Sequence, residues 1–85
     1  MTKEEISTCI KDEIASILEI NPNSIDERDD FLKLGLSSVQ SLKIVNRIKK
    51  KLDMEINPVA MFEFKSVSRL SDYLCVSEKL NKLSD

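Results

Sequence analysis

Apolar side chains recur at helical spacing through most of this 85-residue chain, and this periodicity limits its fold more than any other feature. Residues 3 to 20, for example, place on one helical face Ile6, Ile10, Ile14, Ile17 and Leu18. Only one glycine and two prolines are present to interrupt helices. Because so short a chain supports one small core, we expect an all-α fold: a small four-helix bundle with a long first loop, forming a single domain over residues 1 to 85.

Helix-end signals divide the chain into four helical segments. The predicted helices span residues 3 to 20, 38 to 52, 58 to 63 and 66 to 80. Thr2 can cap the first helix, and Ser37 begins an S-x-x-Q capping box with Gln40 at the second. Asn57, which is followed by a proline, and Ser66 are typical caps for the third and the fourth.

The remaining apolar residues predict the rest of the core. The second helix contributes Val39, Leu42, Ile44, Val45, Ile48 and Leu52. The third contributes Val59, Met61 and Phe62, and the last contributes Val67, Leu70 and Leu74, with Leu80 and Leu83 further along. The long loop is too apolar for an unattached linker, so we expect it to be pinned to the core through Ile25, Phe31, Leu32 and Leu34.

Several classes of function are disfavoured by what the chain lacks. It has no histidine, and its two cysteines, Cys9 and Cys75, have no C-x-x-C spacing, which argues against metal and redox sites. We expect both thiols to be reduced. No apolar run approaches a membrane span, and the acid-containing start does not resemble a signal peptide, so we expect a cytoplasmic protein without membrane association.

The net charge of −2 hides a division along the chain. Residues 38 to 52 hold five basic residues and no acidic one, whereas residues 1 to 37 hold nine acidic and four basic residues. Opposite the apolar stripe of the second helix lie Gln40, Lys43, Arg47, Lys50 and Lys51. This pattern predicts a cationic exposed face, which either docks a partner or is simply solvated.

Ser38 occupies a chemically distinctive position, because it is the first residue inside the second helix once Ser37 is its cap. The unpaired amides and the positive dipole end of a helix stabilise an anion there. The chain's only glycine, Gly35, lies just before and has no side chain to obstruct an approaching group. A phosphoryl group esterified to Ser38 would suit this position; the alternative is that both serines only begin a helix.

The segment from Phe31 to Val39, FLKLGLSSV, resembles the F-x-x-L-G-x-D-S-L signature of acyl carrier proteins, with Ser38 at the modified serine. The resemblance continues over nearly the whole chain. It includes the apolar positions Leu42, Val45 and Ile48, and the ending formed by Met61-Phe62-Glu63-Phe64, Ser66-Val67 and Leu70-Tyr73-Leu74.

The resemblance implies a four-helix acyl carrier domain with 4′-phosphopantetheine covalently attached to Ser38. A separate Mg-dependent phosphopantetheinyl transferase would install this arm from coenzyme A, and its thiol would carry acyl groups as thioesters. The domain would then be a substrate rather than an enzyme. Residues flanking the arm would be Gly35, Leu36, Ser37 and Val39.

The resemblance also implies partner docking on the second helix, by acyltransferase or ketosynthase-type enzymes. The predicted docking residues are Leu36, Gln40, Lys43, Arg47 and Met61, with Leu36 expected to be exposed because it precedes the cap. Fatty-acid carriers present acidic residues on this helix, so the basic face favours partners with acidic or apolar docking surfaces. We expect a monomer.

The chain departs from the family pattern at informative positions. Ser37 replaces the usual aspartate and Lys65 stands where proline is frequent. The G-G-H-S of peptide-synthetase carriers is absent, so the site looks more like that of polyketide-synthase carriers. A peptidyl or aminoacyl carrier and an unmodified helical docking adaptor remain alternatives. A DNA-binding helical domain is disfavoured, because the acidic remainder would repel nucleic acid. Whether the carrier is free-standing or part of a synthase stays open.

Overall fold

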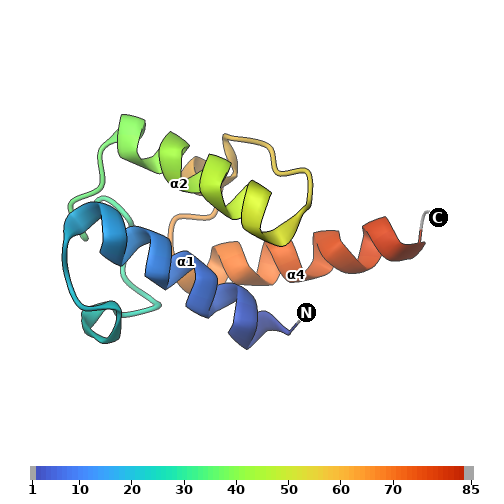
Figure 1. The fold of residues 1–85 in the computed structure, drawn as a ribbon, viewed down its shortest axis with the longest axis horizontal. Helices are drawn as coiled ribbons and strands as arrows, with labels where there is room; N and C mark the ends of the chain where they lie inside the picture. The colour runs from blue at the N-terminus through green and yellow to red at the C-terminus, as the bar shows by residue number, and fades with distance from the viewer. Residues whose placement is uncertain (1, 84–85) are drawn as a thin grey trace.

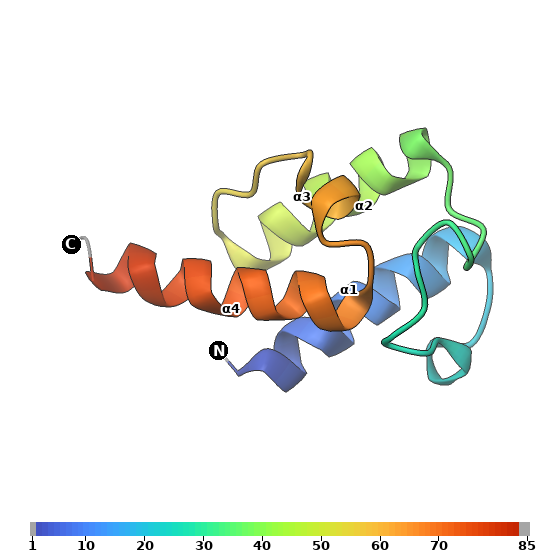
Figure 2. The same cartoon turned by 180° about the vertical axis from the view of Figure 1, so that it is seen from behind.

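Three longer helices surround one core in the computed structural model, which describes residues 2 to 83 and the side chains of residues 2 to 77 (Figure 1). In chain order, the described elements are α1 (Lys3–Leu18), a single 3-10 turn η1 (Pro22–Ser24), α2 (Ser38–Leu52), the short α3 (Ala60–Glu63) and α4 (Val67–Leu83). α1 packs against both α2 and α4, and α3 lies beside α2 (Figure 2). The predicted all-α four-helix fold with a long first loop is confirmed.

Capping residues begin α1, α2 and α4 as their sequence signals predict, but the predicted cap of the third helix, Asn57, is wrong: α3 follows Val59, which makes no side-chain capping hydrogen bond. Thr2 and Glu5 form a capping box at the start of α1, where the Glu5 N–H donates to Thr2 Oγ1 over 3.2 Å. At α4, the Arg69 N–H donates to Ser66 Oγ over 3.3 Å. These local hydrogen bonds satisfy amides that have no partner within the helix.

Helix boundaries differ from the prediction by a few residues. α1 ends at Leu18, because Glu19 is left-handed, with φ 57°, and its N–H donates to the Ala15 carbonyl. The third helix begins at Ala60 rather than residue 58, because Asn57 Oδ1 accepts from the Val59 N–H and closes a turn first. α4 continues to Leu83, beyond the predicted end at residue 80.

The core is built from apolar faces of all the helices. Its fully enclosed large side chains include Ile6, Ile10, Ile14, Ile44, Ile48, Leu70 and Leu74. The predicted core positions Leu80 and Leu83 lie outside the described side chains.

Five residues predicted to be in the core are exposed instead: Leu32, Val39, Leu42, Val59 and Phe62. Val39 lies two residues before the buried Ser41, which is roughly 200° around the helix, so it faces away from the core. The single turn of α3 buries Ala60 and Met61 and leaves Phe62 outside. A short helix has only one side to bury, and the sequence does not show which side that is.

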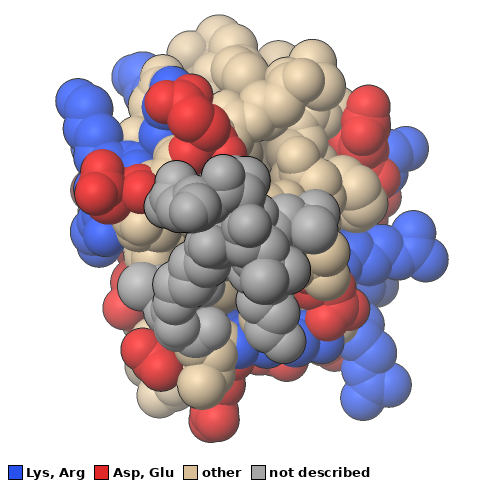
Figure 3. Space-filling model, turned by 90° about the vertical axis from the view of Figure 1, so that its right-hand side faces the viewer, with Lys and Arg blue, Asp and Glu red and all other residues tan. Residues whose placement is uncertain are grey.

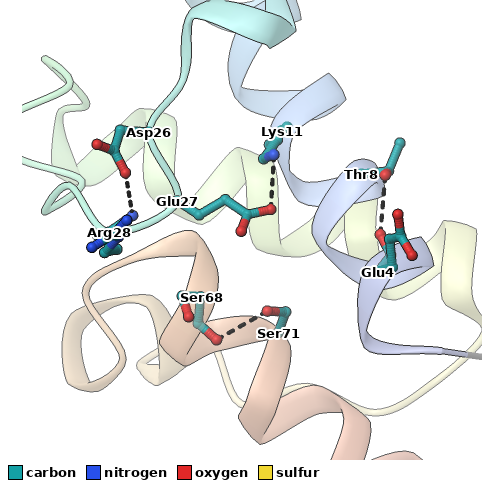
Figure 4. A network of polar contacts seen from close by, with 8 residues as sticks. All are labelled: Glu4, Thr8, Lys11, Asp26, Glu27, Arg28, Ser68 and Ser71. Carbon is teal, nitrogen blue, oxygen red and sulfur yellow. Dashed lines mark hydrogen bonds and ion pairs between the residues drawn. The ribbon is translucent and has the colours of Figure 1, made fainter.

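The long first loop is fixed to both α1 and α4, as its apolar residues predict. Ile25 and Phe31 are buried in the core. Figure 4 shows Glu27 between these helices: its carboxylate pairs with Lys11 Nζ of α1 over 2.8 Å, and its carbonyl accepts from the Ser68 N–H of α4 over 2.9 Å. The Phe31 N–H donates to the Lys65 carbonyl over 2.7 Å. The loop therefore holds a defined position before it enters α2.

Candidate functional site

Ser37 and Ser38 mark the start of α2, but their hydroxyls are in different situations. Ser37 is the cap: its Oγ accepts from the Gln40 N–H over 3.1 Å, and Gln40 Oε1 accepts from the Ser37 N–H over 2.9 Å. Ser38 is the first helical residue and is exposed. Its hydroxyl has no hydrogen-bond partner among the described residues. The capping box is thus formed as predicted, and the Ser38 hydroxyl is left available to solvent.

The turn that delivers Ser38 depends on Gly35. Asp30 Oδ1 accepts a hydrogen bond from the Leu32 N–H over 2.8 Å. The turn that follows is closed by a hydrogen bond from the Gly35 N–H to the Leu32 carbonyl. Gly35 has φ +94°, which is strained for any L side chain. Apart from Gly35 and its two chain neighbours, no residue has a heavy atom within 4 Å of where a Cβ would be, so glycine is required here by backbone conformation rather than by crowding.

A pocket of about 300 Å³ opens next to Ser38, between the long loop, the start of α2 and α3. Its lining includes Phe31, Leu36, Ser38, Ser41, Met61 and Phe62. Phe31, Leu36 and Met61 are almost fully buried and form apolar walls, whereas Leu32 and Phe62 are exposed at its border. The site therefore combines an accessible hydroxyl with an adjoining, mostly apolar hollow.

The structure brings Gly35, Leu36 and Ser37 next to Ser38, but two of the predicted docking residues are not on the surface. Leu36 is only 3% exposed, so the prediction of an exposed contact there is wrong. Met61 is buried as well, at 2%. Leu36 lies between Gly35 and the cap, and its side chain is part of the buried core. Both residues shape the pocket wall instead.

Sequence reasoning missed Ser41 and Asp30, which also line the pocket. The available signal for Ser41 was its spacing, because residues three apart on a helix share a face and Ser41 follows Ser38 by three. Lys65, noticed only as a departure from the family pattern, reaches the same pocket. No sequence signal placed Asp30 there.

The basic face of α2 is partly engaged within the domain. Glu13 of α1 is buried, at 5% exposure, and its carboxylate receives Lys51 Nζ at 2.6 Å and an Arg47 guanidinium nitrogen at 3.5 Å. The hydrogen bond to Glu13 raises the pKa of Lys51. Arg47, predicted as a docking residue, is thus tied to α1.

Other charges of α2 differ in their pairing. Lys49 pairs with Glu55 over 3.3 Å. Figure 3, which looks onto the end of the molecule where α2 finishes, shows acidic and basic side chains side by side. Lys43 and Lys50 are exposed and make no ion pair with a described residue. They are the α2 cations best placed to meet another molecule.

Cys9 and Cys75 are both free thiols, and both are half-buried and packed against the core. Burial raises the pKa of Cys9. Among the described residues, no three histidine, cysteine or acidic side chains gather into a potential metal site. Within the same part of the chain, no helix has both the length and the apolar character to cross a bilayer.

Comparison with known proteins identifies the family. Residues 10–74 match the family model described as "Phosphopantetheine attachment site". Among curated relatives, polyketide synthase PksN of Bacillus subtilis is 27% identical over 71 residues, covering 84% of this chain. Gramicidin S synthase 2 of Brevibacillus brevis is 30% identical over 57 residues, covering 67% of this chain. The chain spans only 1% of the length of each of these two relatives.

A solved structure gives the same family from the fold. A free-standing peptidyl carrier protein from an uncharacterized Acinetobacter baumannii secondary metabolic pathway superposes with a TM-score of 0.82 at 26% identity. The match covers 89% of this chain and 94% of that protein.

Domains of this family carry covalently attached 4′-phosphopantetheine and are substrates of modifying enzymes rather than catalysts. The residues present suit that group. An exposed hydroxyl lies at a helix N-terminus, no acidic residue occupies the first turn of α2, and an adjoining pocket has room for part of an arm. By its matching residues, its fold and this site, the chain belongs to the phosphopantetheine-binding carrier domains of the acyl carrier protein family.

Proposed function

We propose that Ser38 carries the 4′-phosphopantetheine arm, and that the arm's thiol holds acyl intermediates as thioesters between enzymes of a polyketide or related biosynthetic pathway. The observation that carries this proposal is the position of Ser38: the exposed first residue of α2, one step beyond the capping Ser37. A tether at this point raises the local concentration of the bound acyl group at each partner's active site.

The electrostatics of the first turn support an anionic ester at Ser38. The amides at the start of α2 and the helix dipole favour negative charge. Ser37 preserves the capping bond that an aspartate would make, and its neutral side chain adds no repulsion to a phosphodiester. Substitution of the family's aspartate by serine is therefore compatible with modification.

Activation of Ser38 must come from the transferase. The chain has no histidine, and the Ser38 hydroxyl has no hydrogen-bonded base among the described residues. During transfer, Oγ forms a bond to phosphorus of coenzyme A, the bond to the departing 3′,5′-ADP breaks, and a base of the transferase takes the hydroxyl proton. This division of labour suits a carrier that is a substrate.

A peptidyl or aminoacyl carrier is the alternative that specific observations favour. The similar proteins include both a polyketide synthase and a peptidyl carrier. The polyketide assignment rests on the sequence Gly35-Leu36-Ser37-Ser38, which lacks G-G-H-S. Presenting the holo protein with acyltransferases and with amino-acid-activating enzymes, and weighing the loaded product, separates the two.

The first experiment is the intact mass of the protein before and after incubation with coenzyme A, Mg²⁺ and a promiscuous phosphopantetheinyl transferase. We expect one phosphopantetheine adduct on the wild type and on Ser37→Ala, and none on Ser38→Ala. Ser37→Ala is the matched control, because it removes a neighbouring hydroxyl while leaving Ser38 in place. If folded wild type stays unmodified with several transferases, the carrier proposal fails and the helical adaptor takes its place.

A further inference from the structure

Basic residues line a second hollow, of about 210 Å³, between the long loop and the start of α4. They are Arg28 of the loop, Lys65 just before α4 and Arg69 in its first turn, and all are exposed. We call these residues the basic cluster. The hollow is completed by Asp30 and Ser66, and none of the described α2 residues lines it. The basic cluster is therefore separate from the cationic face of α2.

Backbone contacts hold the loop beside the start of α4 and so keep the basic cluster together. The residue before Arg28 accepts a hydrogen bond from α4 through its carbonyl, over 2.9 Å. Asp30 and Ser66 form an antiparallel β-bridge, and the Phe31 N–H donates to the Lys65 carbonyl over 2.7 Å. Figure 4 shows Arg28 on the loop beside the start of α4. Cations that are far apart in the sequence are thus fixed at one place by the main chain.

The charge of the basic cluster is not neutralised within the domain. None of its cations forms an ion pair with a described residue. Asp30 is the one carboxylate among the described lining residues, and its Oδ1 already accepts from the Leu32 N–H over 2.8 Å. Nearby acids are paired with other cations: Glu27 with Lys11, Asp29 with Lys33 and Asp72 with Lys3. The hollow therefore keeps a net positive charge.

The position of these cations does not serve the stability of α4. The N-terminal end of a helix carries a partial positive charge and is stabilised by acidic side chains. The first turn of α4 has no acidic residue and contains Arg69, while Lys65 precedes it. A group of cations that opposes the helix dipole and has no partner in the described chain points to an anionic partner outside it.

We propose that the basic cluster is a docking surface for an acidic segment of a partner protein. This inference does not rest on attachment at Ser38. Each exposed ion pair is worth little in water, so the cluster would hold a single carboxylate or phosphate only weakly. A polypeptide with several carboxylates engages all the cations together, and complementary charge also speeds its association. Because Lys65 and Asp30 line the Ser38 pocket as well, a partner docked here lies next to Ser38.

The experiment titrates the isotope-labelled apo protein with a short peptide of alternating Glu and Gly and follows the amide signals by NMR. A peptide of alternating Gln and Gly and inorganic phosphate are titrated in parallel. The variants are Arg69→Glu and Lys50→Glu, which change the net charge equally. Lys50 is the matched control, because it is exposed, makes no ion pair with a described residue and does not line this hollow.

Arg69→Glu should fold at least as well as the wild type, so that weaker binding cannot be attributed to unfolding. The Arg69 N–H donates to Ser66 Oγ, and a glutamate at this position completes the capping box of α4. Thermal unfolding checks this. Lys65→Gln, which removes a charge without reversing it, should weaken peptide binding in the same direction.

We expect the Glu peptide to shift the signals of the basic cluster more than those of Lys43 and Lys50, and the Gln peptide to shift neither. At low salt, Arg69→Glu should weaken Glu-peptide binding about threefold to tenfold, and Lys50→Glu by less than about twofold. Equal weakening by both reversals, or no shift of the cluster, would overturn the proposal. Phosphate binding as tight as that of the peptide would leave only a simple anion site. Shifts caused by raising the protein concentration alone would make a second copy of this chain the occupant instead.

Discussion

At the scale of single residues, the backbone gives two adjacent serines different tasks. Ser37 has an extended conformation, with φ −82° and ψ 167°, and its hydroxyl is occupied by the Gln40 amide. Ser38 has entered the helix, so its hydroxyl cannot cap and points to no protein partner among the described residues. Identical side chains thus supply a helix cap at one position and, in the proposed function, the attachment point at the next.

This division predicts different stabilities for the two alanine variants. Ser37→Ala should lower the free energy of unfolding by about 1 kcal/mol, because an amide of α2 loses its cap. Ser38→Ala should change it by less than about 0.5 kcal/mol, because the lost hydroxyl is exposed. Urea denaturation followed by circular dichroism measures both. Equal losses in the two variants would contradict the assignment of Ser37 as the cap.

At the scale of helices, Glu13 joins α1 to α2. Its buried carboxylate meets Lys51 and Arg47, which lie about one turn apart near the end of α2. Both cations are roughly half exposed, so they retain much of their hydration while neutralising Glu13. The pairing specifies which side of α2 faces α1.

The Glu13–Lys51 pair predicts a loss of stability in alkali. The hydrogen bond raises the pKa of Lys51 above its ordinary 10.5, so its contribution is fully present below pH 10.5 and disappears as pH rises through the folded-state pKa. Burial raises the pKa of Cys9 above 9.0, so Cys9 also lowers the stability as the pH rises. The effect of Lys51 is therefore measured between two variants that both carry Cys9→Ala. Between pH 9 and about pH 12, unfolding free energy should fall more steeply in Cys9→Ala than in Cys9→Ala/Lys51→Met. Parallel curves would show that the pair contributes nothing.

At the scale of the whole molecule, the domain is a compact support for the exposed Ser38. Its radius of gyration, 12.0 Å, agrees with the roughly 12 Å expected for a compact chain of this length. The long loop is anchored to α1 and α4, and the Ser38 pocket lies where that loop, α2 and α3 meet. Two exposed apolar residues, Leu32 and Phe62, line this pocket, and Val39 and Leu42 on α2 are exposed as well. A partner that docks on α2, as the sequence predicts, would meet these apolar residues as well as the cations of α2.

Charge reversal tests whether a partner uses those cations. Lys43→Glu should lower kcat/KM for acyl loading by the cognate enzyme about threefold to fivefold, with a smaller loss at high salt. Lys33→Glu, on the exposed loop, is the control and should have little effect. Arg47→Glu is unsuitable, because it would place a second negative charge beside the buried Glu13 and disturb the fold. Unchanged kinetics for Lys43→Glu would remove the docking proposal.

Prediction from sequence succeeded where the cause is local. The capping boxes at Thr2 and Ser37 involve side chains three residues apart, so their hydrogen bonds can be read from the residue types. The environment proposed for Ser38 follows in the same way from a cap, a glycine turn and the motif around them. Apolar periodicity likewise identified the buried face in the middle of each long helix.

The amino-acid sequence by itself determined the three long helices, their caps and the serine on which the proposed function rests, because these depend on neighbours within about one turn. Only the tertiary structure decided that Leu36 is buried while Phe62 is exposed, since each depends on which element covers it. Only the fold brings Arg47 to Glu13, which is 34 residues away in the sequence. Part of the basic face of α2 therefore forms ion pairs within the domain. The pocket that Ser41 shares with Met61 exists for the same reason: α2 and α3 are brought together by packing that no local pattern encodes.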